Sequence, residues 1–141
     1  MLINAYLPDT YDAAMQLNAF GIICSDIEAS VSFYRSLGVS LDHDESESGH
    51  YEAQLGGGIR LMLDSEAVME SFIDDFRSPK GNDRVSLAVE CDAPAQVDET
   101  YTSVVAAGAV GVKEPFDAFW GQRYATVLDP DGNHVDLYAR L

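Results

Sequence analysis

The strongest constraint on the fold is a pattern of one strand, one helix and three strands that occurs twice in the chain. In each half, a short apolar run precedes a stretch with helical spacing, and three short strand-like runs separated by turns follow. The second occurrence begins about 65–75 residues after the first, which is the length of one supersecondary unit. We therefore predict two packed copies of one module. The expected strands are 17–24, 39–44, 50–55 and 59–63 in the first copy and 84–91, 110–115, 123–129 and 134–139 in the second.

Each half carries one predicted helix with a recognisable beginning and end. Ser25 and Glu28 have the spacing of a capping box, and Gly38 ends the first helix. Pro94 suits the first turn of the second helix, and Gly108 ends it. Residues at helical spacing give each helix one apolar side. They are Ile27, Val31, Tyr34 and Leu37 in the first helix and Val97, Tyr101, Val104 and Val105 in the second.

These elements divide one compact domain of 141 residues into four segments. They are an N-terminal arm (1–16), the first module (17–65), a linker (66–83) and the second module (84–141). Apolar residues in the linker fit an amphipathic helix or a compact connection, either packed on the core or acting as a lid. The acid-rich stretch 42–48 is expected on an exposed hairpin whose charges block edge pairing, with a cation-collecting rim as the alternative.

Composition excludes several classes of partner. The net charge of −16 argues against binding to nucleic acid or to an anionic membrane. It leaves two interpretations, a cationic ligand or a solvated acidic surface. No apolar run approaches the roughly 18–20 residues that span a bilayer, and the first residues do not form a signal peptide, so we expect a cytoplasmic protein. Cys24 and Cys91 fit buried free thiols and not a disulfide framework or a zinc pair.

Both ends of the repeated pattern carry more specific motifs. Near the start stand the pairs Asp26-Ile27, Phe33-Tyr34 and Leu37-Gly38, and near the end stands the turn 129–133, Asp-Pro-Asp-Gly-Asn. With these motifs in register, residues 17–141 resemble the glyoxalase / bleomycin-resistance / extradiol-dioxygenase superfamily. The resemblance implies an α+β fold in which two tandem βαβββ modules form a cup-shaped mixed sheet around a small molecule.

The resemblance also identifies four positions that hold metal ligands in metal-dependent members. Here they are Ala19, Arg60, Arg84 and Asp136. Alanine has no donor atom and arginine stays protonated, whereas a catalytic metal site needs about three protein ligands. The resemblance therefore implies a member without a metal or another cofactor. His134 and Asp136 lie two apart on one strand, which leaves a metal-binding pair as the weaker alternative.

The remaining candidates are residues that could bind a ligand in the cup. The resemblance places Arg60, Arg84 and Asp136 where they could form a charge-assisted cluster in place of the metal. Aromatic residues would supply buried area, mainly from the loop-like stretch before the seventh strand. These candidates are Phe116, Phe119 and Trp120 in that stretch, Tyr124 and Tyr138 on strands, and Tyr51.

Two classes of function fit this set. One is a non-catalytic binder of a small molecule, planar or antibiotic-like, similar to the antibiotic-resistance members of the superfamily. The other is an enzyme, either a lyase or dioxygenase with a divalent metal on His134 and Asp136, or a metal-free enzyme with a carboxylate as acid or base. The missing ligand positions favour the binder, and the sequence leaves its ligand open. The resemblance further implies a homodimer in which modules of two chains complete each cup, with the common C₂ symmetry.

Overall fold

The computed structural model describes residues 15–43, 48–81 and 84–141, and every structural statement below refers to these residues. Most of the expected N-terminal arm and the centre of the acid-rich hairpin, residues 44–47, lie outside them. The first module contains β1 (Ala19–Cys24), α1 (Ile27–Ser36), β2 (Asp42–His43), β3 (His50–Gly56) and β4 (Ile59–Ser65). After α2 (Glu66–Glu70), the second contains β5 (Ser86–Glu90), α3 (Pro94–Ala106), β6 (Gly111–Ala118), β7 (Gln122–Leu128) and β8 (His134–Arg140).

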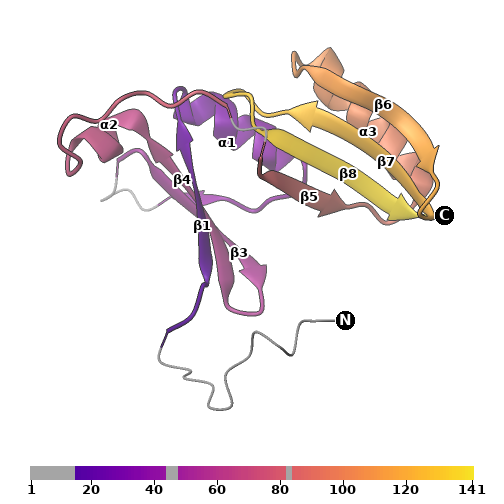
Figure 1. Cartoon of the computed structure of the whole chain (residues 1–141), viewed down its shortest axis with the longest axis horizontal. Coiled ribbons are helices and arrows are strands. Elements are labelled where there is room, and N and C mark those ends of the chain that lie inside the picture. Colours follow the sequence, from indigo (N-terminus) through magenta and orange to yellow (C-terminus); the bar gives the residue numbers. More distant parts are fainter. Residues whose placement is uncertain (1–14, 44–47, 82–83) are drawn as a thin grey trace.

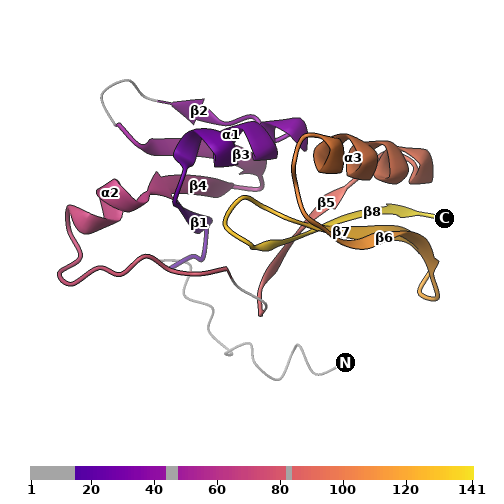
Figure 2. The same cartoon turned by 90° about the horizontal axis from the view of Figure 1, so that it is seen from above.

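The two modules have the same topology. Each forms a four-stranded sheet, in the order β1-β4-β3-β2 or β5-β8-β7-β6 (Figure 1). In both sheets the first strand of the module pairs in parallel with the last, and the other neighbours are antiparallel. The predicted α+β fold with two tandem βαβββ modules is therefore confirmed. Within the chain the two sheets stay separate and neither closes on itself (Figure 2).

The start of α1 differs from the predicted capping box in an informative way. Asp26, and not Ser25, is the N-cap, and its side chain accepts a hydrogen bond from Ala29 N at 3.1 Å. Ser25 is turned to the second module, where its backbone N–H and its hydroxyl both donate to the carboxylate of Asp131. A polar residue that local sequence assigns to the helix end thus serves a contact between modules.

Other boundaries shift because of tertiary context. The expected strand 39–44 is reduced to Asp42–His43 among the described residues, and α2 is a single short turn of helix. β5 begins at Ser86, so Arg84 precedes the strand instead of lying on it. β6 continues through Pro115 to Ala118, beyond its predicted end. Proline is tolerated there because β6 is an edge strand whose register shifts between Lys113 and Phe116.

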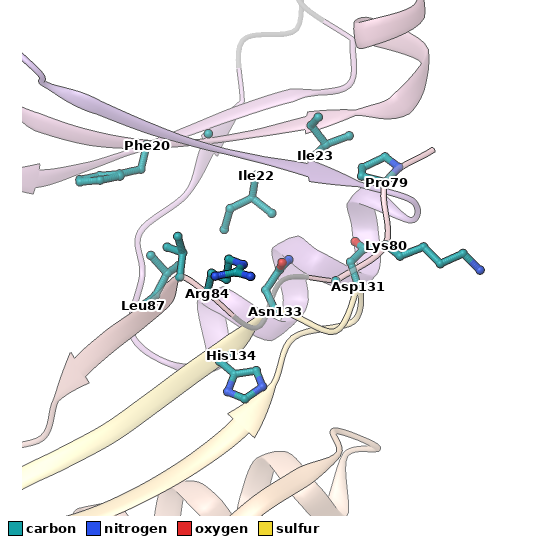
Figure 3. Close-up of a pocket in the computed structure, with 13 residues that line it drawn as sticks. Phe20, Ile22, Ile23, Pro79, Lys80, Arg84, Leu87, Asp131, Asn133 and His134 are labelled. Carbon is teal, nitrogen blue, oxygen red and sulfur yellow. The ribbon is translucent and has the colours of Figure 1, made fainter. Parts of the chain in front are cut away.

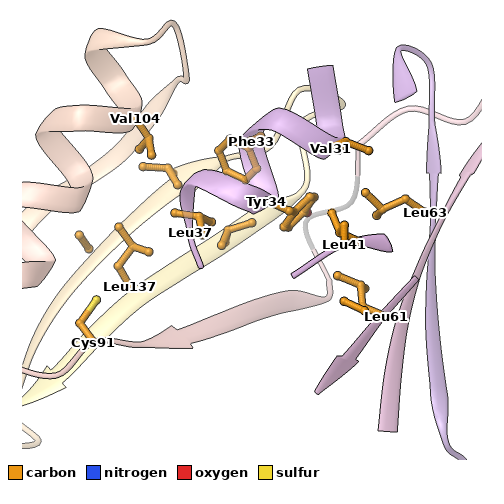
Figure 4. Close-up of a cluster of buried hydrophobic side chains, with 14 of the residues drawn as sticks. Val31, Phe33, Tyr34, Leu37, Leu41, Leu61, Leu63, Cys91, Val104 and Leu137 are labelled. Carbon is orange, nitrogen blue, oxygen red and sulfur yellow. The ribbon is translucent and has the colours of Figure 1, made fainter. Parts of the chain in front are cut away.

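One hydrophobic core joins the two modules. Alternate residues of each sheet, such as Leu61 and Leu63 in the first and Val135 and Leu137 in the second, are buried against the helices. Side chains from both modules belong to the same cluster of buried residues, and α1 lies between its two halves (Figure 4). Both cysteines are buried free thiols within it, as predicted.

A polar contact between α1 and the turn β7–β8 reinforces this core. The hydroxyl of Asp129 Oδ1 also accepts from the backbone N–H groups of Asp131 and Asn133, and Oδ2 accepts from the Asn133 amide. We call this group, together with Ser25, the module joint. It attaches the first module to a tight turn of the second.

Helices of the described residues are short. None of them is long and apolar enough to cross a membrane.

Candidate functional site

Each sheet has one face covered by its helix and one face turned away from it, which we call the open face. On β4, Arg60, Met62 and Asp64 alternate with buried leucines, and on β8, Asp136 and Tyr138 alternate with buried Val135 and Leu137. Cross-strand partners point to the same side of a sheet. The register therefore places the polar and aromatic residues of neighbouring strands on the open faces.

The open face of the second sheet carries an aromatic cluster. Phe116, at the end of β6, lies opposite Tyr124 on β7, and Tyr138 of β8 lies opposite Tyr124 on its other side. The Trp120 ring stands edge-on to Phe116 and Tyr124, with centroids 6.1 and 5.4 Å apart. Phe119 contacts Trp120 at 5.0 Å and is 97% exposed at the hairpin tip. Five predicted aromatic residues are therefore gathered at one end of this sheet.

Asp136 forms the polar centre of the same face. Its Oδ2 accepts a hydrogen bond from the Tyr124 hydroxyl at 2.6 Å, and its Oδ1 accepts one from Thr126 Oγ1 at 2.7 Å. Burial first, and then the bond to Asp136, raise the pKa of Tyr124 to about 12, so the phenol remains a donor at neutral pH. The Lys113 ammonium lies 4.8 Å from the centre of the Phe116 ring at the border of this cluster. The arrangement holds a fixed carboxylate beside stacking surfaces.

The open face of the first sheet carries a chain of alternating charges. Arg60 donates to Glu52 Oε1 at 2.8 Å, and the same oxygen lies 3.0 Å from His50 Nε2. His50 Nδ1 lies 2.5 Å from Asp64 Oδ1. Partial desolvation lowers the pKa of His50, but the bonds to Asp64 and Glu52 outweigh it and raise the pKa above its ordinary value. The bond from His50, followed by the bond from Arg60, lowers the pKa of Glu52.

The remaining predicted residues lie in different places. Arg60 is engaged with Glu52 on the first sheet, whereas Asp136 accepts from two hydroxyl groups on the second. Arg84 lines a cavity between the two modules. Tyr51 projects to the helix side of the first sheet, where its hydroxyl donates to Glu28 at 3.2 Å. The predicted joint role of Arg60, Arg84 and Asp136 in ligand binding stays a prediction.

The residues at the family's ligand positions do not fit a metal. Ala19 lies opposite Arg60 in the β1–β4 register, so a methyl group and a cation occupy this pair of positions. Both carboxylate oxygens of Asp136 are used by Tyr124 and Thr126. In the part of the chain that the structure describes, no group of three or more His, Cys, Asp or Glu side chains is arranged to hold a metal ion.

Sequence reasoning missed the partners of two predicted residues. His50 and Glu52 carry a signal that was overlooked, since they alternate with Tyr51 and buried Ala53 on β3. A strict period of two would have placed them on the open face beside Arg60. Thr126 gave no signal, because a threonine in an apolar strand is ordinary, and only the register shows that it faces Asp136.

Comparisons with known proteins agree with this fold. The family model of the glyoxalase/bleomycin resistance protein/dioxygenase superfamily matches residues 16–137, and the chain belongs to this superfamily. No curated protein matches the sequence.

Solved structures of the same fold are similar at low sequence identity. A hypothetical protein from S. aureus has a TM-score of 0.74 at 21% identity, with 90% of this chain and 95% of that chain covered. A glyoxalase-related enzyme from Fulvimarina pelagi has a TM-score of 0.75 at 20% identity, with 89% and 88% covered. A glyoxalase/bleomycin resistance protein/dioxygenase family enzyme from Burkholderia phytofirmans has a TM-score of 0.71 at 21% identity, with 90% and 100% covered. Likeness at this level concerns the fold alone.

Proposed function

We propose that the protein binds a small, planar molecule on the open face of the second sheet, without a catalytic metal. The observation that carries the proposal is the cluster of Phe116, Trp120 and Tyr124 beside Asp136. Offset and edge-on ring contacts stabilise a bound aromatic group by about 0.5–1.5 kcal/mol beyond its buried area. Asp136 supplies an acceptor that would orient a polar group of the ligand.

Several features support binding over packing as the role of this cluster. Trp120 is 49% exposed although it contacts two other rings, so a large part of its surface remains accessible to a ligand. Its indole N–H is held by Gln122 Oε1 at 2.8 Å, which orients the ring without burying it. An aromatic surface that is fixed in place before binding costs little ordering entropy when a ligand stacks on it.

The proposal is tested by substitution of Trp120, the only tryptophan of the chain. Fluorescence quenching of wild-type protein identifies binders in a panel of planar two- and three-ring compounds. For such a binder, calorimetry of Trp120→Ala is expected to show affinity about tenfold weaker or more, because the main stacking surface is lost. Trp120→Phe should recover part of that affinity. Phe72→Ala removes another exposed aromatic residue, in the linker, and should change nothing.

Two results would contradict this proposal. One is equal affinity in wild type and Trp120→Ala. The other is an unfolded Trp120→Ala together with the absence of any binder for the wild type, because Trp120 would then serve the core. Thermal unfolding of each variant separates loss of binding from loss of folding.

We further propose that a second copy of the chain completes the site. Among the described strands, β1 and β5 are sheet edges that pair on one side only, which leaves backbone groups available to another chain. Pairing of the first module of one copy with the second module of another would bring the charged open face opposite the aromatic one. Light scattering at micromolar concentration is expected to give twice the chain mass of 15.3 kDa. The mass of a single chain at that concentration would refute the homodimer.

A further inference from the structure

A cavity lies where the two modules of one chain meet, away from the aromatic cluster. Its volume is about 650 Å³, within the range of small-molecule sites. The cavity, which we call the junction cavity, is lined by β1, by the linker around Pro79 and Arg84, and by the start of β8 (Figure 3). Neither the superfamily pattern nor the proposed function uses it.

Distance separates the junction cavity from the aromatic cluster. His134, which lines the cavity, begins β8, whereas Arg140 ends β8 and pairs with Gln122 beside Trp120. Six residues of extended strand span about 20 Å. A ligand of drug-like size therefore cannot contact both regions fully, and the two can be tested separately.

The walls of the junction cavity combine an apolar surface with hydrogen-bond donors. Phe20, Ile22 and Leu87 form much of the apolar wall. The guanidinium of Arg84 lies next to the side chain of Asn133 inside this space, whereas the ammonium of Lys80 points away from it (Figure 3). An arginine in such surroundings attracts an anion more strongly than it would in open water, since the local dielectric constant is lower.

Local carboxylates do not make this cavity acidic. Asp131 is the acidic residue among its lining residues, and its carboxylate accepts from the N–H and the hydroxyl of Ser25. Arg84 has five N–H donors, and a bound carboxylate takes two of them, which leaves donors for contacts within the chain. The contrast with the net charge of −16 is informative, because the surface as a whole repels anions whereas this cavity presents a cation.

We propose that the junction cavity binds a small amphipathic organic acid. Its carboxylate would be held by Arg84 in bidentate fashion, with the Asn133 amide as a further donor, and its apolar body would lie on Phe20, Ile22 and Leu87. The ligand class follows from the pairing of one guanidinium with an apolar wall, because an inorganic anion would leave that wall unused.

The test uses 3-phenylpropanoate as the probe and its neutral amide, 3-phenylpropanamide, as the matched compound. In ¹H–¹⁵N spectra of the full chain, the acid at up to about 10 mM is expected to shift the amides of Phe20, Leu87 and Asn133 saturably. The amide should bind at least tenfold more weakly. Arg84→Gln should weaken the acid at least tenfold, and Arg84→Lys by less. Arg77→Gln, an exposed linker arginine, should bind like wild type.

Clear outcomes would overturn this proposal. They are the absence of saturable shifts with the acid, equal binding of acid and amide, and equal binding by Arg84→Gln and wild type. Loss of acid binding in Trp120→Ala with retention in Arg84→Gln would place the acid on the aromatic cluster instead. Superimposable spectra of the free variants establish that each is folded. Because Trp120→Ala is expected to leave acid binding intact, failure here is distinguishable from failure of the proposed function.

Discussion

Asp129→Ala is expected to lower the free energy of unfolding by about 3 kcal/mol. Asp129 is 4% exposed and accepts four hydrogen bonds, one from Tyr34 and three from groups within its own turn. Removing the carboxylate leaves the buried Tyr34 hydroxyl and two backbone N–H groups without their acceptor, and each unsatisfied buried group costs about 1–3 kcal/mol, reduced where water or relaxation compensates. Urea unfolding followed by circular dichroism measures the loss.

Two further variants make this measurement specific. Tyr34→Phe removes only the bond between modules and should cost about 1 kcal/mol, because Asp129 keeps its three other donors. Asp74→Ala removes an exposed linker carboxylate and should stay within about 0.5 kcal/mol of wild type. An Asp129→Ala protein as stable as Asp74→Ala would show that the module joint contributes nothing to stability.

Leu63→Ala and Leu137→Ala are each expected to destabilise the protein by about 2–5 kcal/mol, and to shift the same unfolding transition. Both side chains are fully buried, one in each module, within a single cluster. If the core is continuous, loss of packing in either module lowers the stability of both. Unfolding curves recorded by tryptophan fluorescence, which reports on the second module, and by circular dichroism should therefore coincide in both variants.

A split between the two probes would give the opposite answer. If Leu63→Ala left the fluorescence transition in place while the circular dichroism signal changed earlier, the modules would unfold independently. Val105→Ala, at a position that is 37% exposed on α3, serves as the control for a small apolar truncation. It should cost well under the loss at Leu63 or Leu137, since most of its cavity would be open to solvent.

The fold could be predicted from sequence because its signals are local and repeated. Buried strands such as β4 and β8 alternate clearly, and glycines such as Gly38 and Gly108, both with positive φ, end the helices where expected. Errors arose where distant contacts decide a boundary. Ser25 leaves the predicted capping box because Asp131 of the other module accepts its donors.

The candidate site could be predicted only in part. Phe116, Trp120 and Tyr124 meet as expected, because a hairpin brings the end of β6 next to the start of β7. The engagement of Arg60 with Glu52 was not foreseen, because it depends on the pairing of β3 with β4. Family registration gives the positions of residues, but the partner of each charge follows from the strands that flank it.

The module joint makes the two halves of the chain unequal, which bears on their history if both descend from one duplicated unit. Tyr34 and Tyr101 each stand eight residues after the N-cap of their helix, Asp26 and Ala93. Only Tyr34 meets an acidic turn of the opposite half, whereas the corresponding β3–β4 turn is Gly56-Gly57-Gly58 and offers no carboxylate to Tyr101. A chimera built from two first halves would therefore lack the acceptor Asp129. Mutational drift is thus constrained differently at these matching tyrosines, and a duplicated ancestor with identical halves could have been locked twice or not at all.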